Sequence, residues 1–267
     1  ETLSLNLDGG GWSDEPAVAP AGVLQLENHA AAERLALVEH LACSDDAATA
    51  AEVTALQTFR DLFAREVLRA DQQISVGAIT LVFTDLRDST RLYSAIGDAP
   101  AFGRVLTHFD VLRAAVRREG GAIVKTMGDA VMAVFVRPLP AVRALLQAQQ
   151  HLARPEAFPL PHDVPAPRFA LEPLALKVAI HAGPCLALTQ NGQLDYFGST
   201  VNIGARLCGL SSGADVVLSS AVADDPEVIR YLRTAAAVTP ERVQLRSFGD
   251  REFAISRAQL RAAISEQ

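Results

Sequence analysis

The chain of 267 residues is 49% hydrophobic, which suits a globular protein with one substantial domain and a smaller appendage. A formal charge of −7 without any block of basic residues argues against a nucleic-acid or anionic-membrane partner. No stretch approaches the ~18 uninterrupted apolar residues of a membrane helix, and no signal peptide opens the chain. We therefore expect a soluble, cytoplasmic protein in which the scattered Cys43, Cys185 and Cys208 are reduced core thiols.

Residues 2–40 contain three alternating, extended stretches, TLSLNL, GVLQLEN and ERLALVEH, which predict a few strands of a small β module. Ser44 with Asp45 and Asp46 then predicts a helix start, because a hydroxyl cap and early carboxylates satisfy the free N–H groups there. Apolar residues recur at helical spacing beyond this point. We interpret 44–70 as one amphipathic connecting helix.

From Val76 onward the pattern predicts strand, two helices, two strands, helix, two strands and helix, in that order. The proline-rich stretch 154–173 predicts an irregular loop. Neither a G-x-x-x-x-G-K-[ST] loop nor a G-x-G-x-x-G fingerprint occurs, which argues against a P-loop ATPase or a dinucleotide enzyme. If the protein handles an anion, we expect it to do so through a metal.

The stretch GAITLVFTDLRDST, residues 77–90, is an apolar strand that ends in Asp85 and is followed by Asp88, Ser89 and Thr90. A carboxylate at the end of a buried strand, beside the free N–H groups of a helix start, suits a metal-bound polyphosphate. Taken alone, the stretch is also explained if Asp85 merely caps the following helix.

The stretch VKTMGDAVMAVF, residues 124–135, predicts two short strands that turn at Gly128 and Asp129. Asp129 is thus a second carboxylate at a strand turn, and two such aspartates on adjacent strands can share a pair of divalent ions. Lys125 is one of only two lysines in the chain, which suggests that its ammonium has a function. A solvated lysine on the strand face is the alternative, and we assign no role to the other lysine, Lys177.

The stretch QLDYFGSTVNIGARLCGL, residues 193–210, predicts a helix that starts at Ser199 or Thr200. Asn202 and Arg206 lie four residues apart, one above the other, on the flank of its apolar stripe. An amide and a guanidinium placed in this way can orient a ribose and meet charge that develops on phosphorus. An ordinary surface pair explains the same spacing.

Together these motifs resemble the class III nucleotidyl cyclases, adenylyl and guanylyl, over about residues 76–257. The resemblance implies an α+β fold, a ferredoxin-like palm with the order βααββαβ, preceded here by a β-rich segment and a connecting helix. The N-terminal segment resembles the end of a regulatory module that precedes the catalytic domain in some bacterial cyclases. The expected parts are the β-rich segment 1–43, the connecting helix 44–75, the catalytic domain 76–258 and the tail 259–267.

The resemblance also implies a role for every candidate residue. The implied metal ligands, for two Mg²⁺ or Mn²⁺ ions, are Asp85, the backbone carbonyl of Leu86, and Asp129. The implied substrate contacts are Leu86, Asp88, Ser89 and Thr90 at the phosphates and Lys125 and Asp195 at the purine. The implied transition-state pair is Asn202 and Arg206. The resemblance further implies a head-to-tail homodimer with two shared sites, each taking its metal ligands from one chain and the other four residues from its partner.

Adenine presents an acceptor at N1 and a donor at its 6-amino group, so a lysine donor and an aspartate acceptor match it, whereas guanine reverses both roles. The pair Lys125 and Asp195 therefore predicts an adenylate cyclase that converts ATP to 3′,5′-cyclic AMP and pyrophosphate. The alternatives are a guanylate cyclase and a catalytically silent, cyclase-like module that binds nucleotide for regulation.

The sequence departs from the family pattern at two places in the expected phosphate site. Asp88 occupies a position at which many relatives have glycine, so its charge either weakens phosphate binding or points outward. The lysine that relatives use near the C-terminus to hold the phosphates has no clear match in LRSFGDREFAIS. Arg246 or Arg251 would replace it there.

Overall fold

The computed structural model describes residues 2–8, 11–12, 23–29, 48–63, 68, 72–155, 173–246 and 248–261. The chain divides into two compact units, residues 1–47 and residues 48–267. No helix within the described ranges is both long and apolar enough to cross a membrane. Several predictions fall outside these ranges: the strand ERLALVEH, the helix start at Ser44, Cys43 and most of the proline-rich loop.

The first unit contains a three-stranded sheet with the order β2-β1-β3. Its strands are β1 (Thr2–Asp8), β2 (Gly11–Trp12) and β3 (Val23–Asn28). β1 pairs antiparallel with β2 and parallel with β3. The stretches TLSLNL and GVLQLEN are therefore strands, as their alternation predicts.

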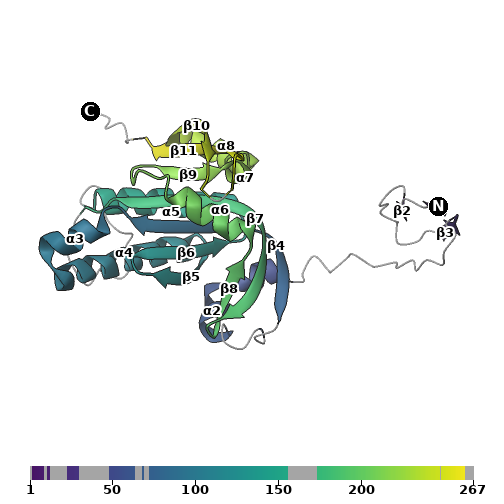
Figure 1. Cartoon of the computed structure of the whole chain (residues 1–267), viewed down its shortest axis with the longest axis horizontal. Helices are drawn as coiled ribbons and strands as arrows, with labels where there is room; N and C mark the ends of the chain where they lie inside the picture. The colour runs from purple at the N-terminus through teal and green to yellow at the C-terminus, as the bar shows by residue number, and fades with distance from the viewer. Residues whose placement is uncertain are drawn as a thin grey trace. The chain divides into compact units, whose positions relative to one another are not determined.

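The second unit is built on an eight-stranded sheet with the order β10-β11-β9-β7-β4-β6-β5, in which β8 pairs with β7 off this path (Figure 1). The strands are β4 (Gln73–Leu86), β5 (Ala122–Met127), β6 (Ala130–Phe135), β7 (Leu176–Gln190), β8 (Gln193–Phe197), β9 (Val216–Ser219), β10 (Ala236–Gln244) and β11 (Glu252–Leu260). β7 and β9 are parallel, and the other neighbours are antiparallel.

Within the described residues, six helices connect these strands: α3 (Ser89–Ile96), α4 (Asp98–Arg118), α5 (Pro138–Ala153), α6 (Ser199–Cys208), α7 (Ser220–Ala223) and α8 (Pro226–Ala235). From β4 to β7 the order is strand, two helices, two strands, helix and strand. The predicted α+β, ferredoxin-like palm is thus confirmed.

Hydrophobic clusters lie on both faces of the sheet. On one face α4 and α5 pack against side chains that include Val82 and Ile180. On the other face α6 packs on β7 and β4, over Leu81 and Phe83 (Figure 1). Because side chains alternate along a strand, Asp85 falls on the α6 face together with Leu81 and Phe83.

Two short helices precede the sheet, α1 (Ala50–Thr54) and α2 (Gln57–Phe63). Thr49 caps α1: its hydroxyl accepts from the Glu52 N–H, and the Glu52 carboxylate accepts from the Thr49 N–H. α1 packs against β4 whereas α2 packs against β5, and β6 separates these two strands. α1 ends at Thr54, with Ala55 at its C-cap, and α2 begins at Gln57, so the prediction of a single continuous helix is wrong for these residues.

Candidate active site

Asp85 lies near the end of β4, on the α6 face of the sheet. The N-cap position of α3 belongs to Asp88, so the alternative in which Asp85 caps this helix is wrong. Partial burial, and after it the charge of Asp129, raise the pKa of the Asp85 carboxyl above its ordinary value. The nearby Lys177 ammonium opposes this rise in pKa but does not cancel it.

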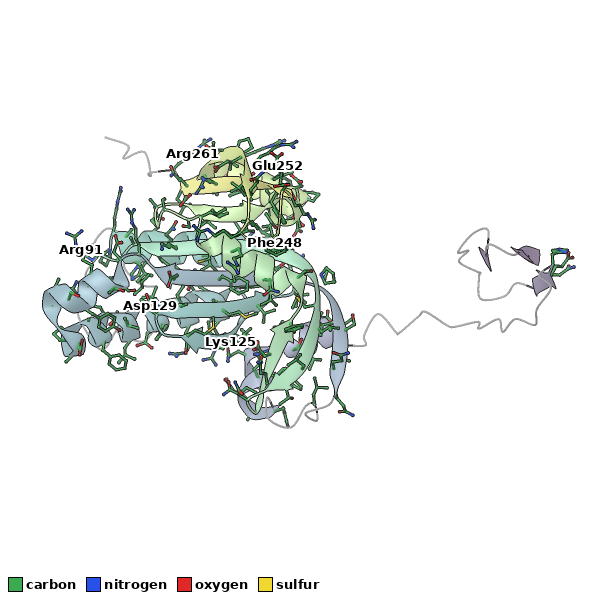
Figure 2. The ribbon with its side chains drawn as sticks, in the orientation of Figure 1. Arg91, Lys125, Asp129, Phe248, Glu252 and Arg261 are labelled. Carbon is green, nitrogen blue, oxygen red and sulfur yellow. The ribbon has the colours of Figure 1, made fainter. Side chains whose placement is uncertain are left out.

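Asp129 occupies the tight turn between β5 and β6, as predicted (Figure 2). The turn depends on Gly128, whose φ of +63° lies in the left-handed region that favours glycine. Thr84 of β4 pairs with Val131 of β6, so the turn brings Asp129 beside the end of β4. Its Oδ2 atom is buried and has no hydrogen-bond partner among the described residues.

Two neighbouring carboxylates, one with an unpartnered buried oxygen, form an arrangement that a divalent cation stabilises. The described residues contain no group of three or more His, Cys, Asp or Glu that could hold a metal. The two aspartates would thus fill only part of a coordination sphere and leave positions for other oxygens. Leu86 is 3% exposed, and only its backbone carbonyl can contribute. The residues present fit the expected cations.

Cys208 is the thiol near these carboxylates, on the buried side of α6, with Sγ 3.8 Å from the Lys177 carbonyl oxygen. Burial, and then the charge of Asp85, raise the pKa of the Cys208 thiol to about 12. It therefore stays protonated at neutral pH and offers no thiolate ligand. Cys185 is also a free, buried cysteine, so both described cysteines are core thiols, as predicted.

Lys177 is a candidate that sequence reasoning missed. It pairs with Asp85 across β4 and β7, and its Nζ lies 3.7 Å from Asp85 Oδ2. The two side chains are 27% and 41% exposed, so the pair faces a region that solvent and ligands reach. The interpretation that Lys177 has no role is therefore corrected: it places a cation beside the first candidate metal ligand.

The expected phosphate turn links β4 to α3. Asp88 has φ +56° and ψ +30°, the left-handed conformation that glycine adopts most easily, which explains why glycine suits this position. Its carboxylate makes no capping hydrogen bond and lies 3.4 Å from Arg87 Nε, with 67% of the side chain exposed. The extra charge thus points outward. Ser89 and Thr90 form the first turn of α3, where helix N–H groups lack intrahelical partners.

Lys125 and Asp195 meet in the structure. Lys125 is on β5, Asp195 is on β8, and the ammonium lies 2.5 Å from Asp195 Oδ2. The second oxygen, Oδ1, accepts from the Tyr196 N–H at 2.8 Å, which fixes the carboxylate. The Lys125 side chain is 32% exposed and that of Asp195 is 9% exposed. The Lys125 ammonium, a donor, and the Asp195 carboxylate, an acceptor, therefore lie side by side in a partly buried position.

α6 begins at Ser199, as predicted, and its exposed side carries Asn202 and Arg206. Neither side chain makes a hydrogen bond or ion pair with another described residue. The buried side of the helix rests directly on β4 because Gly204 has no side chain. A Cβ atom at Gly204 would lie 2.4 Å from Cε2 of Phe83. The close approach fixes the height at which Asn202 and Arg206 stand above the sheet.

The two C-terminal arginines differ. The Arg251 guanidinium stacks over the Phe253 ring, 4.9 Å from its centroid. Arg246 is exposed, directly follows the buried Leu245, and makes no ion pair with another described residue. Phe248 in the same turn packs with the hydrophobic cluster on the α6 face (Figure 2). Arg246 is thus the freer of the two cations.

The chain belongs to the adenylate and guanylate cyclase catalytic domain family, because the model of that family matches residues 72–230, more than half of the sequence. The adenylate cyclase of Lachancea kluyveri is 33% identical over 175 residues, covering 61% of this chain and 9% of that protein. An uncharacterized protein of Mycobacterium tuberculosis is 29% identical over 169 residues, covering 60% of this chain and 51% of its own. The chain therefore spans a small part of the yeast enzyme and about half of the mycobacterial protein.

Solved structures of cyclases share the fold. An adenylate cyclase from Trypanosoma brucei, in its monomeric state, gives a TM-score of 0.55 at 24% identity, covering 70% of this chain and 95% of that one. The adenylyl cyclase from P. aeruginosa gives 0.54 at 18% identity, covering 72% and 98%. A guanylate cyclase domain from Catenaria anguillulae, in complex with GTP, gives 0.55 at 17% identity, covering 71% and 100%. Adenylyl and guanylyl cyclases are thus equally similar in fold.

Proposed function

We propose that this chain is the catalytic part of an adenylate cyclase, which converts ATP to 3′,5′-cyclic AMP and pyrophosphate. The observation that carries the proposal is the pair Lys125 and Asp195, an oriented donor and acceptor 2.5 Å apart. An adenine placed beside the pair would receive a hydrogen bond at N1 from the Lys125 ammonium and donate one from its 6-amino group to the Asp195 carboxylate. Guanine would leave buried polar groups unpaired, at a cost of about 1–3 kcal/mol each.

In the proposed reaction the ribose 3′-hydroxyl oxygen attacks the α-phosphorus and closes the cyclic ester. The bond from that phosphorus to the oxygen of the β-phosphate breaks, pyrophosphate leaves, and the hydroxyl proton is released. Asp85, Asp129 and the Leu86 carbonyl would hold the divalent cations. When bound, Mg²⁺ or Mn²⁺ would lower the pKa of the 3′-hydroxyl and neutralise phosphate charge.

Asn202 and Arg206 would act at the reacting centre. The Asn202 amide would orient the ribose, and the Arg206 guanidinium would stabilise the negative charge that develops at the α-phosphorus. Both side chains are exposed and free of partners in the described part of the chain, which suits groups that wait for a ligand. Their roles rest on this availability and on the family resemblance.

Three groups would hold the remaining phosphates. Lys177, 3.7 Å from Asp85, can place its ammonium against phosphates bound at the same cations. Arg246, the freer C-terminal arginine, would take the position of the family lysine. The N–H groups of Ser89 and Thr90 would add hydrogen bonds from the start of α3. The outward carboxylate of Asp88 leaves this turn open to an anion.

We further propose a homodimer with two shared sites. Cys208, on the buried side of α6, lies near Asp85, whereas Asn202 and Arg206 stand on the exposed side of the same helix. The transition-state pair is thus directed away from the metal ligands of its own chain. A second copy, placed head to tail, would supply those ligands.

Two alternatives remain from different classes. A guanylate cyclase is disfavoured by the donor and acceptor order of Lys125 and Asp195. A silent nucleotide-binding module typically lacks a metal aspartate or the transition-state arginine, and this chain has Asp85, Asp129 and Arg206.

The test is to incubate the purified chain, at several protein concentrations, with ATP or GTP and Mn²⁺ or Mg²⁺. We expect cyclic AMP and pyrophosphate in equal amounts, with little cyclic GMP, measured by mass spectrometry. Asp85→Asn/Asp129→Asn is the control for contaminating enzymes. Preferential cyclic GMP would favour the guanylate cyclase, and nucleotide binding without any cyclic product would favour the silent module.

A further inference from the structure

The pair Lys125 and Asp195 stands on two strand edges. β5 is the last strand of the sheet, and β8 pairs only with β7 among the described strands. Each strand therefore has one side whose backbone N–H and C=O groups lack a sheet partner. β5 and β8 contact each other where Lys125 meets Asp195. The spacing between the two edges sets the geometry of the pair.

α2 satisfies one backbone group on each of these edges. On β5, the Ile123 N–H donates to Gln57 Oε1 at 2.7 Å, two residues before Lys125. On β8, Arg60 Nη2 donates to the carbonyl of Leu194, the residue before Asp195. A register shift in β5 falls between Ile123 and Lys125, so the Gln57 contact holds the strand where it is irregular.

Arg60 is a buried arginine, 6% exposed. Its Nη1 donates to the Thr54 carbonyl at 3.1 Å, and its Cζ lies 5.5 Å from the centroid of the Tyr196 ring. Burial lowers the pKa of Arg60, and the negative charge of Asp195 offsets only part of this effect. A buried guanidinium is costly unless it is paired, so its contacts tie α2 firmly to β8.

We propose that Gln57 and Arg60 are positioning residues that hold β5 and β8 at the separation at which Lys125 and Asp195 recognise a purine. The helix pair α1 and α2 thereby sets the preference for adenine over guanine. This inference rests on the proposed adenine-reading role of Lys125 and Asp195. The first helices of the second unit, which begins at residue 48, would therefore influence base recognition directly.

The functional test compares kcat/KM for ATP and GTP in the full chain carrying Gln57→Leu, Arg60→Met or Arg60→Lys. Misplacing one of two base contacts should reduce the ATP to GTP ratio about tenfold, mainly through a higher KM for ATP. Arg60→Lys keeps the charge with fewer donors and should lie between Arg60→Met and the parent. Thr58→Ala, an exposed position on the same helix, is the matched control and should keep the parent ratio.

A second measurement does not depend on activity. Hydrogen exchange at the Ile123 amide should be faster in Gln57→Leu than in the parent and in Thr58→Ala, because its acceptor is lost. Unchanged exchange would overturn the contact, and an unchanged ATP to GTP ratio in folded Gln57→Leu and Arg60→Met would overturn the positioning role. A parent that makes no cyclic nucleotide would refute the proposed function instead, and the exchange result would still decide whether α2 holds β5.

Discussion

The ammonium of Lys177 lies 3.7 Å from Oδ2 of Asp85, across the antiparallel strands β7 and β4. The β4–β7 register places both side chains on the α6 face, with Asp129 close to Asp85. The site therefore combines two carboxylates with one cation. Cations bound at the carboxylates would free the Lys177 ammonium for substrate phosphate.

Lys177→Met should lower kcat/KM for ATP about 10-fold to 100-fold, because a charge-assisted hydrogen bond contributes about 1.5–3 kcal/mol. Lys177→Arg should retain most of the activity, since it keeps a cation at the same place. Initial rates over a range of ATP concentrations measure the effect, and Arg233→Met on the exposed side of α8 is the control. If Lys177→Met has the same kcat/KM for ATP as the parent, Lys177 does not contribute to substrate binding.

The contact between Lys125 and Asp195 predicts a change of base preference. Lys125→Glu with Asp195→Cys replaces the donor by an acceptor and removes the original acceptor. We expect the ATP to GTP ratio of kcat/KM to fall at least tenfold, since about 1.4 kcal/mol corresponds to a factor of ten. Competition assays with both nucleotides provide the measurement. If the folded double variant keeps the parent ratio, these residues do not read the purine.

The proposed shared site predicts complementation between two inactive variants. Asp85→Ala/Asp129→Ala and Asn202→Ala/Arg206→Ala should each be inactive alone. Mixing them makes about half of the dimers heterodimers with one complete site of two, so about a quarter of the parent rate should return. The recovered rate should fall on dilution as dimers dissociate. A mixture that exchanges subunits, shown by labelled chains, and stays inactive at every concentration would contradict the shared site.

His181 predicts how stability depends on pH. It is partly buried on β7, its Nδ1 has no hydrogen-bond partner among the described residues, and burial lowers its pKa to about 4. The unfolded chain, with an ordinary histidine near ~6.5, binds this proton more tightly, so stability is lost as pH falls from there toward the folded value.

Between pH 7 and pH 5 the parent should lose about 1–2 kcal/mol more unfolding free energy than His181→Gln. Urea unfolding of both proteins at the two pH values gives this difference. The comparison within each protein cancels the cost of the substitution itself. Equal losses in parent and variant would show that His181 is protonated as easily in the fold as in the unfolded chain.

The order of elements from β4 to β7 could be predicted because hydrophobic periodicity is a local property of the sequence. The same local signal suggested one helix over 44–70, and it failed where tertiary contacts decide. Arg60 bends back to the Thr54 carbonyl and reaches across to Leu194, far along the chain. Residue spacing within a helix cannot predict the contact between Arg60 and Leu194, because the two residues are distant in the sequence.

The candidate site shows the same division. Asp85 and Asp129 could be predicted from the sequence because each stands at a turn, next to a stretch with a clear strand pattern. The partner of Lys177 could not, because strand register is set by pairing across the sheet and a shift of one residue would place its side chain on the other face. The meeting of Lys125 with Asp195 was implied by the family resemblance alone, and the two-strand-edge geometry now gives it a physical basis.

The helix α6 packs closely on β4 because Gly204, which has no side chain, faces the large ring of Phe83. A Cβ atom at Gly204 would lie 2.4 Å from that ring. We expect a change at either position alone to destabilise the fold, because a larger residue on the helix would collide with the Phe83 ring and a smaller residue on the strand would open a void. We expect these two positions to vary together during evolution, as a coupled pair. The height of Asn202 and Arg206 above the sheet would be inherited with them.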